Sequence, residues 1–126
     1  MSLTTPVKKA RGLGSAKDGV QHFWMQRLTA IALIPLGLWF AWFMARNFGV
    51  DYESARFSLM DPWTAGAALL FVLAGIYHMK LGLQVIVEDY VHGEGAKLTL
   101  IVLNTFVCAA LASVSGLALL AIYVGF

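Results

Sequence analysis

The chain has 126 residues, of which 60% are hydrophobic and only 13% are charged, with a formal net charge of +2. A water-soluble domain of this length carries roughly twice that charged fraction, and the mean hydropathy is +0.75. Three runs, at 28–45, 63–79 and 98–126, contain no charged residue. Since a membrane-spanning helix needs about 20 mostly apolar residues, the sequence predicts an all-α membrane protein with three transmembrane helices and no separate soluble catalytic domain.

The segment at 1–26 is polar, basic and rich in glycine. It lacks the apolar centre of a secretory signal, and it has little of the amphipathic pattern of a mitochondrial presequence, so we interpret it as a cytoplasmic N-terminal segment. The spans are expected at 27–46, 63–88 and 97–126, in a single domain that covers 1–126. The single cysteine, Cys108, falls in the third span, which excludes an intrachain disulfide.

Basic residues favour one orientation of these spans, because cytoplasmic segments carry an excess of Lys and Arg. Five of them precede or open the first span: Lys8, Lys9, Arg11, Lys17 and Arg27. The N-terminus is therefore predicted to lie inside, with the first loop outside and the second loop inside.

His78 is an ionisable side chain in the second span. It is expected ~21 Å from the outer end of the span and ~14 Å from the inner end, close to the bilayer midplane. An ionisable residue at that depth is costly and normally faces protein, water or a cofactor. His78 is therefore a candidate functional residue.

Three interpretations of His78 remain open at this point: an interhelical hydrogen bond to Ser, Thr or Asn, a proton relay, or an axial ligand to a haem iron. Gly75 and Gly82 lie within about 60° of His78 on the helix, and small residues there admit a flat partner, either a haem or a helix. Lys80 points about 200° away and is expected to extend toward the inner headgroups. The relay is weakened because the other spans carry no carboxylate or histidine at mid-depth.

A haem with two histidine ligands would need a second imidazole at the depth of His78. The other histidines, His22 and His92, belong at the inner boundary, ~14 Å or more away. The second ligand would therefore have to come from another subunit or a second copy.

The inner end of the second span carries a second candidate site. Asp89 lies within about 20° of the His78 face, three turns on, and Tyr90 follows it. A phenol beside a carboxylate suits a quinone head group, because the phenol can donate to a carbonyl and the carboxylate can orient it or exchange protons. The alternative is a helix stop with an interfacial tyrosine. Arg27 either anchors the first span or pairs with a haem propionate.

With "GLQVIVEDYVHG" after His78, and "GVQHFWMQRLTAI" leading into the first span, the chain resembles the smaller membrane-anchor subunit of succinate dehydrogenase, respiratory complex II. The resemblance covers essentially the whole chain. It implies a single membrane-anchor domain in a heteromeric helical bundle, in which His78 gives one axial ligand to haem b. It further implies that Tyr90 and Asp89 belong to the ubiquinone site and that Arg27 lies near the haem propionates. Some members have His-Asp where this chain has Gln21-His22, so no role of that pair is carried over.

The same resemblance implies three protein partners: a second anchor subunit of the cytochrome b556 type, an iron–sulfur subunit and a flavoprotein subunit. Together they would pass electrons from succinate to ubiquinone, with this chain as a non-flavin subunit that is not catalytic alone. A bacterial inner membrane is the expected location, with the mitochondrial inner membrane as the alternative, and no nucleic-acid partner is expected. Two other functions stay open: a fumarate reductase anchor with the same fold, and a small transporter or channel subunit with His78 at the midplane.

Overall fold

The computed structural model describes residues 16–126, with side chains from Gly19 onward, and these residues form four helices and no strand. The helices are α2 (Ala16–Asn47), α3 (Tyr52–Leu59), α4 (Pro62–Tyr90) and α5 (Glu94–Val124). Among them α2, α4 and α5 are long and apolar enough to cross a membrane. The predicted all-α membrane protein with three spans is confirmed.

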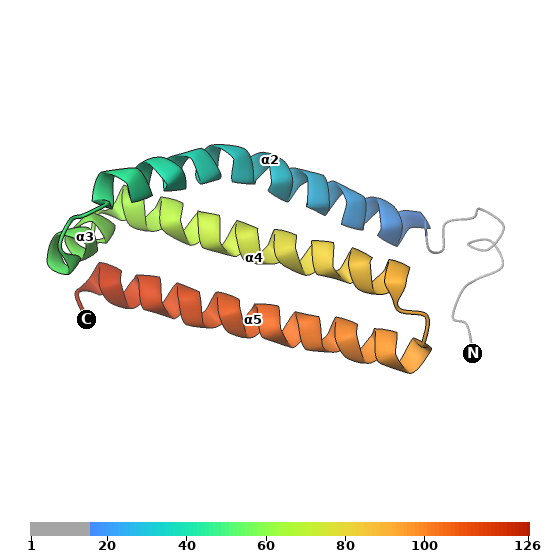
Figure 1. Cartoon of the computed structure of the whole chain (residues 1–126). Helices are drawn as coiled ribbons and strands as arrows, with labels where there is room; N and C mark the ends of the chain where they lie inside the picture. Colours follow the sequence, from blue (N-terminus) through green and yellow to red (C-terminus); the bar gives the residue numbers. More distant parts are fainter. Residues whose placement is uncertain (1–15) are drawn as a thin grey trace.

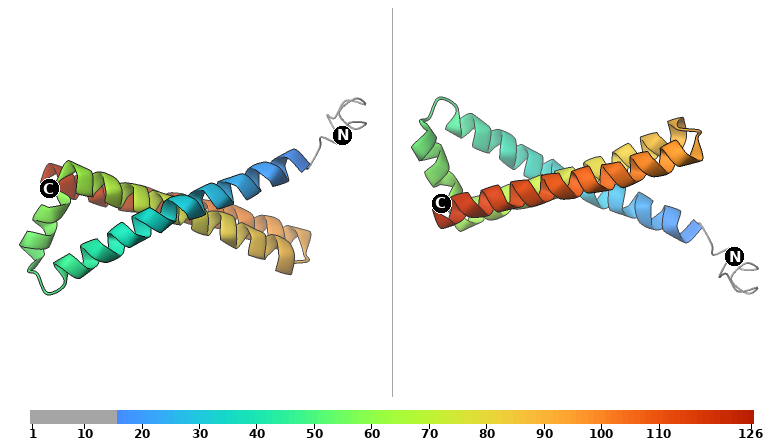
Figure 2. Two further views of the ribbon diagram at one scale, coloured as in Figure 1. Left: turned by 90° about the horizontal axis from the view of Figure 1, so that it is seen from above. Right: turned by 90° about the horizontal axis from the view of Figure 1, so that it is seen from below.

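The three long helices lie in one row, with α4 in the middle and each neighbour running antiparallel to it (Figure 1). We call the end where α2 begins and α4 ends the inner end, after the predicted topology, and the opposite end the outer end. In Figure 2, α2 crosses α4 obliquely near the middle of both helices, so the two helices diverge toward both ends, whereas α4 and α5 stay in contact along their length. The row thus places one helix, α4, in contact with both others.

Local sequence signals set the helix ends. The Asp61 carboxylate caps α4 by accepting hydrogen bonds from the backbone N–H of Thr64 at 2.9 Å and from its hydroxyl at 3.0 Å. Pro62 follows at the first helical position, where its missing N–H costs nothing. Gly125, in the left-handed conformation with φ 85°, ends α5. At the other end of the chain, α2 begins at Ala16, inside the segment expected to precede the first span, because hydropathy reports an apolar run rather than a helix start.

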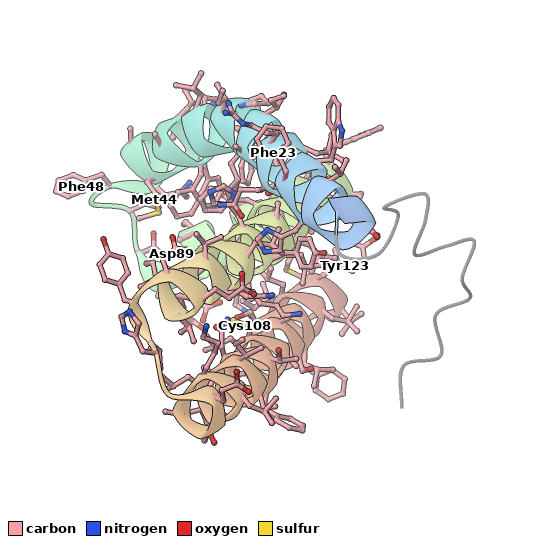
Figure 3. All side chains as sticks on the ribbon, turned by 90° about the vertical axis from the view of Figure 1, so that its right-hand side faces the viewer. Phe23, Met44, Phe48, Asp89, Cys108 and Tyr123 are labelled. Carbon is pink, nitrogen blue, oxygen red and sulfur yellow. The ribbon has the colours of Figure 1, made fainter. Side chains whose placement is uncertain are left out.

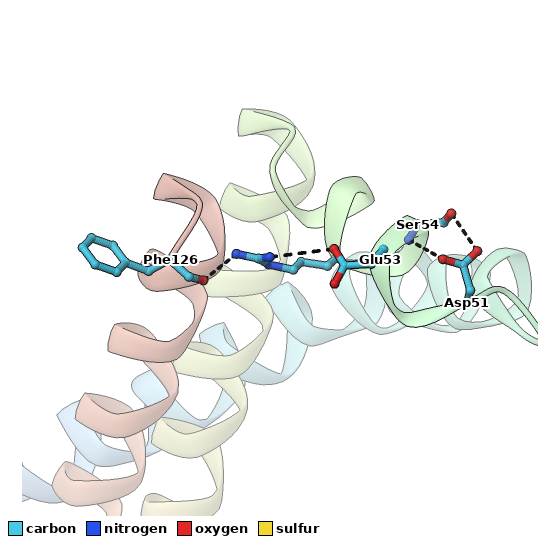
Figure 4. A network of polar contacts seen from close by, with 5 residues as sticks. Asp51, Glu53, Ser54 and Phe126 are labelled. Atoms are coloured by element: carbon cyan, nitrogen blue, oxygen red, sulfur yellow. Dashed lines mark hydrogen bonds and ion pairs between the residues drawn. The ribbon is translucent and has the colours of Figure 1, made fainter.

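The short helix α3 was not predicted. Asp51 caps it by accepting from the Ser54 backbone N–H at 3.0 Å, and Arg56 near its end donates to the backbone oxygen of Phe126 at 2.6 Å. Figure 4 shows this connection, with Glu53 3.8 Å from the same guanidinium. The outer loop is therefore attached to the end of α5.

Contacts between α2 and α4 run in antiparallel order along both helices. Toward the outer end, the rings of Phe40 and Phe71 stack with centroids 4.5 Å apart. Further in, a Cβ added at Gly75 would lie 4.0 Å from Leu33 Cδ2, and one at Gly82 would lie 3.7 Å from Gln26 Nε2. In the part of the chain that the structure describes, the side chains that lie against these two glycines therefore belong to the helix α2.

The α4–α5 contact is joined by a polar side chain. Asn104 of α5 donates from Nδ2 to the backbone oxygen of Lys80 at 3.0 Å, and the Cys108 thiol donates to Asn104 Oδ1 at 3.4 Å. Cys108 is buried and lies between α4 and α5 (Figure 3). An interhelical hydrogen bond in a membrane contributes about 0.6 kcal/mol on average, so this bond sets the register of the two helices more than their stability.

Very few side chains are buried by this chain alone. In the part of the chain that the structure describes, the buried residues are Thr29, Ala68, Leu81 and Cys108. Large apolar side chains such as Leu38 and Phe106, each 70% exposed, cover the outside of the helices instead. Lipid or partner subunits must cover these surfaces, because the row itself has two open faces.

The Asp61 cap gives a testable result. The backbone N–H and hydroxyl of Thr64 hold the pKa of Asp61 below its usual 3.8, so its stabilisation is present above that value and disappears as the pH falls through the lower, folded-state pKa. We expect Asp61→Ala to lower the thermal midpoint at neutral pH, and Asp61→Asn to lower it less, because the amide oxygen still accepts. Circular dichroism melts in detergent measure this. Glu53→Gln, at an exposed carboxylate, is the control, and an Asp61→Ala protein that melts like the native chain would contradict the cap.

The glycine contacts give a second prediction. Gly75→Ala should be tolerated, because its Cβ would meet Leu33 at ordinary contact distance. Gly75→Leu should destabilise the fold by roughly 1–3 kcal/mol, because the larger side chain forces α2 away from α4. Gly37→Leu is the matched control, since nothing lies within 4 Å of a Cβ there. Equal stability losses at the two glycines in detergent unfolding would refute a specific α2–α4 contact.

Candidate functional site

His78 lies in the middle of α4, 16 residues after Pro62 and 12 before Tyr90, which is ~24 Å and ~18 Å along the helix axis. Its ring faces α2 and is half-buried. The ring nitrogen Nδ1 lies 2.9 Å from the hydroxyl oxygen of Thr29, 49 residues earlier in the chain. The interhelical hydrogen bond, one of the three interpretations of His78, therefore accounts for one of its two ring nitrogens.

Thr29 is only 8% exposed. Its hydroxyl also reaches two backbone oxygens of its own helix, that of Met25 at 2.8 Å and that of Gln26 at 3.1 Å. Bonds of this kind, from a threonine to the preceding turn, are ordinary inside apolar helices. What is specific here is that the same oxygen meets an imidazole from the neighbouring helix.

The second ring nitrogen of His78, Nε2, has a different environment. Within residues 16–126, no hydrogen bond reaches it, and it is not among the buried polar atoms that lack a partner. It therefore keeps contact with whatever surrounds the chain. A metal-ligating histidine typically has this arrangement, with one nitrogen hydrogen-bonded and the other available. Among the described residues no group of three or more His, Cys, Asp or Glu side chains could hold an ion, so a metal here would need further ligands from elsewhere.

Asp89 and Tyr90 lie in the last turn of α4, where both side chains are exposed; Tyr90 is 77% exposed. In the described part of the chain neither side chain forms a hydrogen bond, whereas the neighbouring Glu88 accepts from Gln84 at 2.8 Å. They are three turns, or ~17 Å along the axis, from His78. The structure therefore places the two candidate sites on one helix but does not bring them into contact.

Arg27 is exposed on α2, and its guanidinium carbon lies 5.2 Å from the centre of the Phe23 ring. Arg27 is about 200° around the helix from Thr29, the residue that meets α4. The structure thus turns Arg27 away from the side of α2 that faces His78.

Sequence reasoning did not single out Thr29, and it did not identify the polar stripe to which Thr29 belongs. His22, Gln26 and Thr29 recur at helical spacing on α2, and His22 Nε2 and Gln26 Oε1 are buried without a hydrogen-bond partner. Their spacing of four and three residues was the available signal. Only the packing shows that this stripe faces α4.

Comparison with known proteins finds relatives that cover most of this chain. The family described as succinate dehydrogenase/fumarate reductase transmembrane subunit matches residues 1–112. A succinate dehydrogenase hydrophobic membrane anchor subunit from Paracoccus denitrificans is 34% identical over 113 residues, covering 90% of this chain and 88% of that protein. The subunit of the same name from Rickettsia bellii is 36% identical over 96 residues, covering 76% and 77%.

A more distant relative, the succinate dehydrogenase membrane anchor subunit of Reclinomonas americana, is 31% identical over 69% of this chain and 75% of its own length. No solved structure matches the chain. The resemblance seen in the sequence is confirmed, and the chain belongs to the succinate dehydrogenase/fumarate reductase transmembrane subunit family, among its succinate dehydrogenase hydrophobic membrane anchor subunits.

Proposed function

We propose that this multi-pass membrane protein gives His78 as one of two axial ligands to a haem b shared with a second anchor subunit, and that Tyr90 and Asp89 form part of a ubiquinone site. The observation that carries the proposal is the state of the His78 ring, with Nδ1 bonded to Thr29 and Nε2 available. An imidazole without a second partner would be costly in a membrane, and an iron atom is a suitable partner for its remaining nitrogen.

The rest of the chain fits a shared haem. His22 lies near the start of α2 and His92 beyond the end of α4, so neither reaches the depth of His78. The second axial ligand is therefore assigned to the partner anchor subunit. When bound, the haem supplies one-electron redox chemistry. The contribution of this chain is to hold the iron through Nε2, to fix the imidazole ring through Thr29, and to keep water away with the apolar surface of α4.

The quinone site is assigned to the inner end of α4. Tyr90 is exposed there and its hydroxyl can donate to a quinone carbonyl oxygen. Asp89 precedes it and can orient the phenol or exchange protons with water, since a quinone takes up protons together with electrons. Arg27 belongs to this end of α2, and a haem propionate would have to displace its guanidinium from the Phe23 ring.

The chain cannot carry the earlier steps of electron transfer. It has a single cysteine, which lies between helices, whereas iron–sulfur clusters are held by sets of cysteines. The flavin and the clusters are therefore assigned to a flavoprotein subunit and an iron–sulfur subunit, which this chain tethers at the inner surface. We assign the complex to a bacterial inner membrane, with ubiquinone as its electron acceptor.

The relatives favour succinate oxidation over fumarate reduction, because the subunits from Rickettsia bellii, Paracoccus denitrificans and Reclinomonas americana are all named as succinate dehydrogenase subunits. The family itself includes both activities. Membership of this family leaves no observation in favour of the small transporter or channel.

His78→Leu tests the haem assignment in the assembled complex. We expect the b-type signal of the reduced-minus-oxidised spectrum to be lost or strongly altered, because an axial ligand is removed. His78→Asn keeps a polar group for Thr29 and guards against a simple folding defect. His92→Leu, at an exposed histidine beyond α4, is the control and should leave the spectrum unchanged. A native haem spectrum in both His78 variants would contradict the proposed haem ligation.

Tyr90→Phe tests the quinone assignment. Loss of one hydrogen bond should lower ubiquinone reduction by roughly 2- to 13-fold, since such a bond contributes about 0.5–1.5 kcal/mol. The haem spectrum and electron transfer from succinate to a soluble dye should not change. Tyr123→Phe, near the outer end of α5, is the matched control. Equal rates of ubiquinone reduction in the two variants would place the quinone elsewhere.

A further inference from the structure

The Thr29 hydroxyl takes part in more contacts than one proton can serve. Its oxygen lies 2.8 Å from the Met25 backbone oxygen, 3.1 Å from that of Gln26 and 2.9 Å from His78 Nδ1. A hydroxyl has one proton to donate and two lone pairs that accept. The two backbone oxygens can only accept, and two oxygens 2.8 Å apart repel each other unless a proton lies between them, so we assign the hydroxyl proton to the Met25 oxygen.

The place of this proton sets the role of the imidazole, since the Thr29–His78 contact of 2.9 Å can run in either direction, depending on the tautomer. With the hydroxyl proton on the Met25 oxygen, Thr29 Oγ1 meets His78 as an acceptor, and the ring proton is assigned to Nδ1. The hydrogen bonds then run in one direction, from His78 Nδ1–H to the Thr29 oxygen and from the Thr29 hydroxyl to Met25. In the neutral imidazole the other nitrogen, Nε2, holds the lone pair.

We propose that Thr29 is a positioning residue that holds His78 in the Nδ1-protonated tautomer and fixes its ring orientation, so that Nε2 is presented to the haem iron. The inference rests on the proposed haem ligation and deepens it. A hydrogen bond from Nδ1–H to an acceptor also increases electron donation by Nε2. Thr29 therefore favours the ferric haem and lowers its reduction potential.

The helix contact makes this arrangement possible. Gly75 and Gly82 lie one turn before and one turn after His78. Side chains of α2 would lie 4.0 Å from a Cβ added at Gly75 and 3.7 Å from one added at Gly82. Thr29 is buried between the two helices at the same level. The small residues of α4 thus bring the α2 hydroxyl within reach of an imidazole attached to the neighbouring helix.

The test uses the complete complex with Thr29→Val, which has nearly the same shape and no hydroxyl, and Thr29→Ser, which keeps the hydroxyl. In Thr29→Val we expect haem affinity to fall by roughly 10- to 100-fold, and the midpoint potential of the remaining haem to become more positive. Thr29→Ser should stay close to the native complex in both. Thr105→Val is the matched control, because Thr105 also donates to the preceding turn of its helix, at 3.0 Å, but is exposed and meets no histidine.

A second readout does not depend on haem. Nitrogen-15 magnetic resonance of His78 in the haem-depleted complex should report a protonated Nδ1 and an unprotonated Nε2, and Thr29→Val should raise the population protonated at Nε2. A native ring dominated by protonated Nε2 would overturn the inference.

The outcomes separate the two proposals. If the native complex holds no haem, or holds it equally well in His78→Leu, the proposed function fails. If haem depends on His78 but Thr29→Val keeps native affinity and potential, haem ligation stands and the inference about Thr29 is wrong. If Thr29→Ser loses haem as Thr29→Val does, or Thr105→Val loses as much, the effect is one of packing and the inference is again wrong.

Discussion

An imidazole in the middle of a membrane-spanning helix needs a partner for each of its nitrogens, because the hydrocarbon supplies none. The contact between α2 and α4 meets half of this requirement. Thr29 serves Nδ1 at 2.9 Å, and the glycines on either side of His78 allow the two helices to approach closely enough. The other nitrogen, Nε2, has no hydrogen-bond partner among residues 16–126, and the haem that we propose, shared with a second anchor subunit, would fill that position.

Much of the architecture could be read from the sequence, because it depends on local properties. Apolar runs gave the three spans, and helical periodicity put Gly75 and Gly82 on the side of His78. Periodicity could not decide whether a helix or a haem lies against those glycines, since either is flat. It also could not reveal Thr29, whose partner is 49 residues away. The helix α3 could not be predicted in this way, because it has only eight residues and its start signal is a single capping residue, Asp51.

The positions of the candidate site residues along the helices could be predicted from the sequence, whereas the directions of their side chains could not. His78 lies at mid-span as expected, and Asp89 and Tyr90 lie exposed at the end of α4. Arg27 is different, because its place near the inner end follows from the sequence but its direction does not. The structure sets its guanidinium over Phe23, on the side of α2 away from Thr29. Side-chain direction at a helix end depends on which face packs, and that is a property of the whole fold.

The single row of helices has an energetic consequence. Since α2 and α5 each pack on α4, the polar contact with α2 (Thr29 and His78) and the polar contact with α5 (Asn104, Cys108 and the Lys80 backbone oxygen) share no residue. Substitutions that share no partner usually act additively, within about 0.3–0.5 kcal/mol. The polar contact with α2 and the polar contact with α5 can therefore change independently of each other. Substitutions on the α5 side could suit a different lipid or neighbouring subunit and leave His78 and the Thr29 hydroxyl undisturbed.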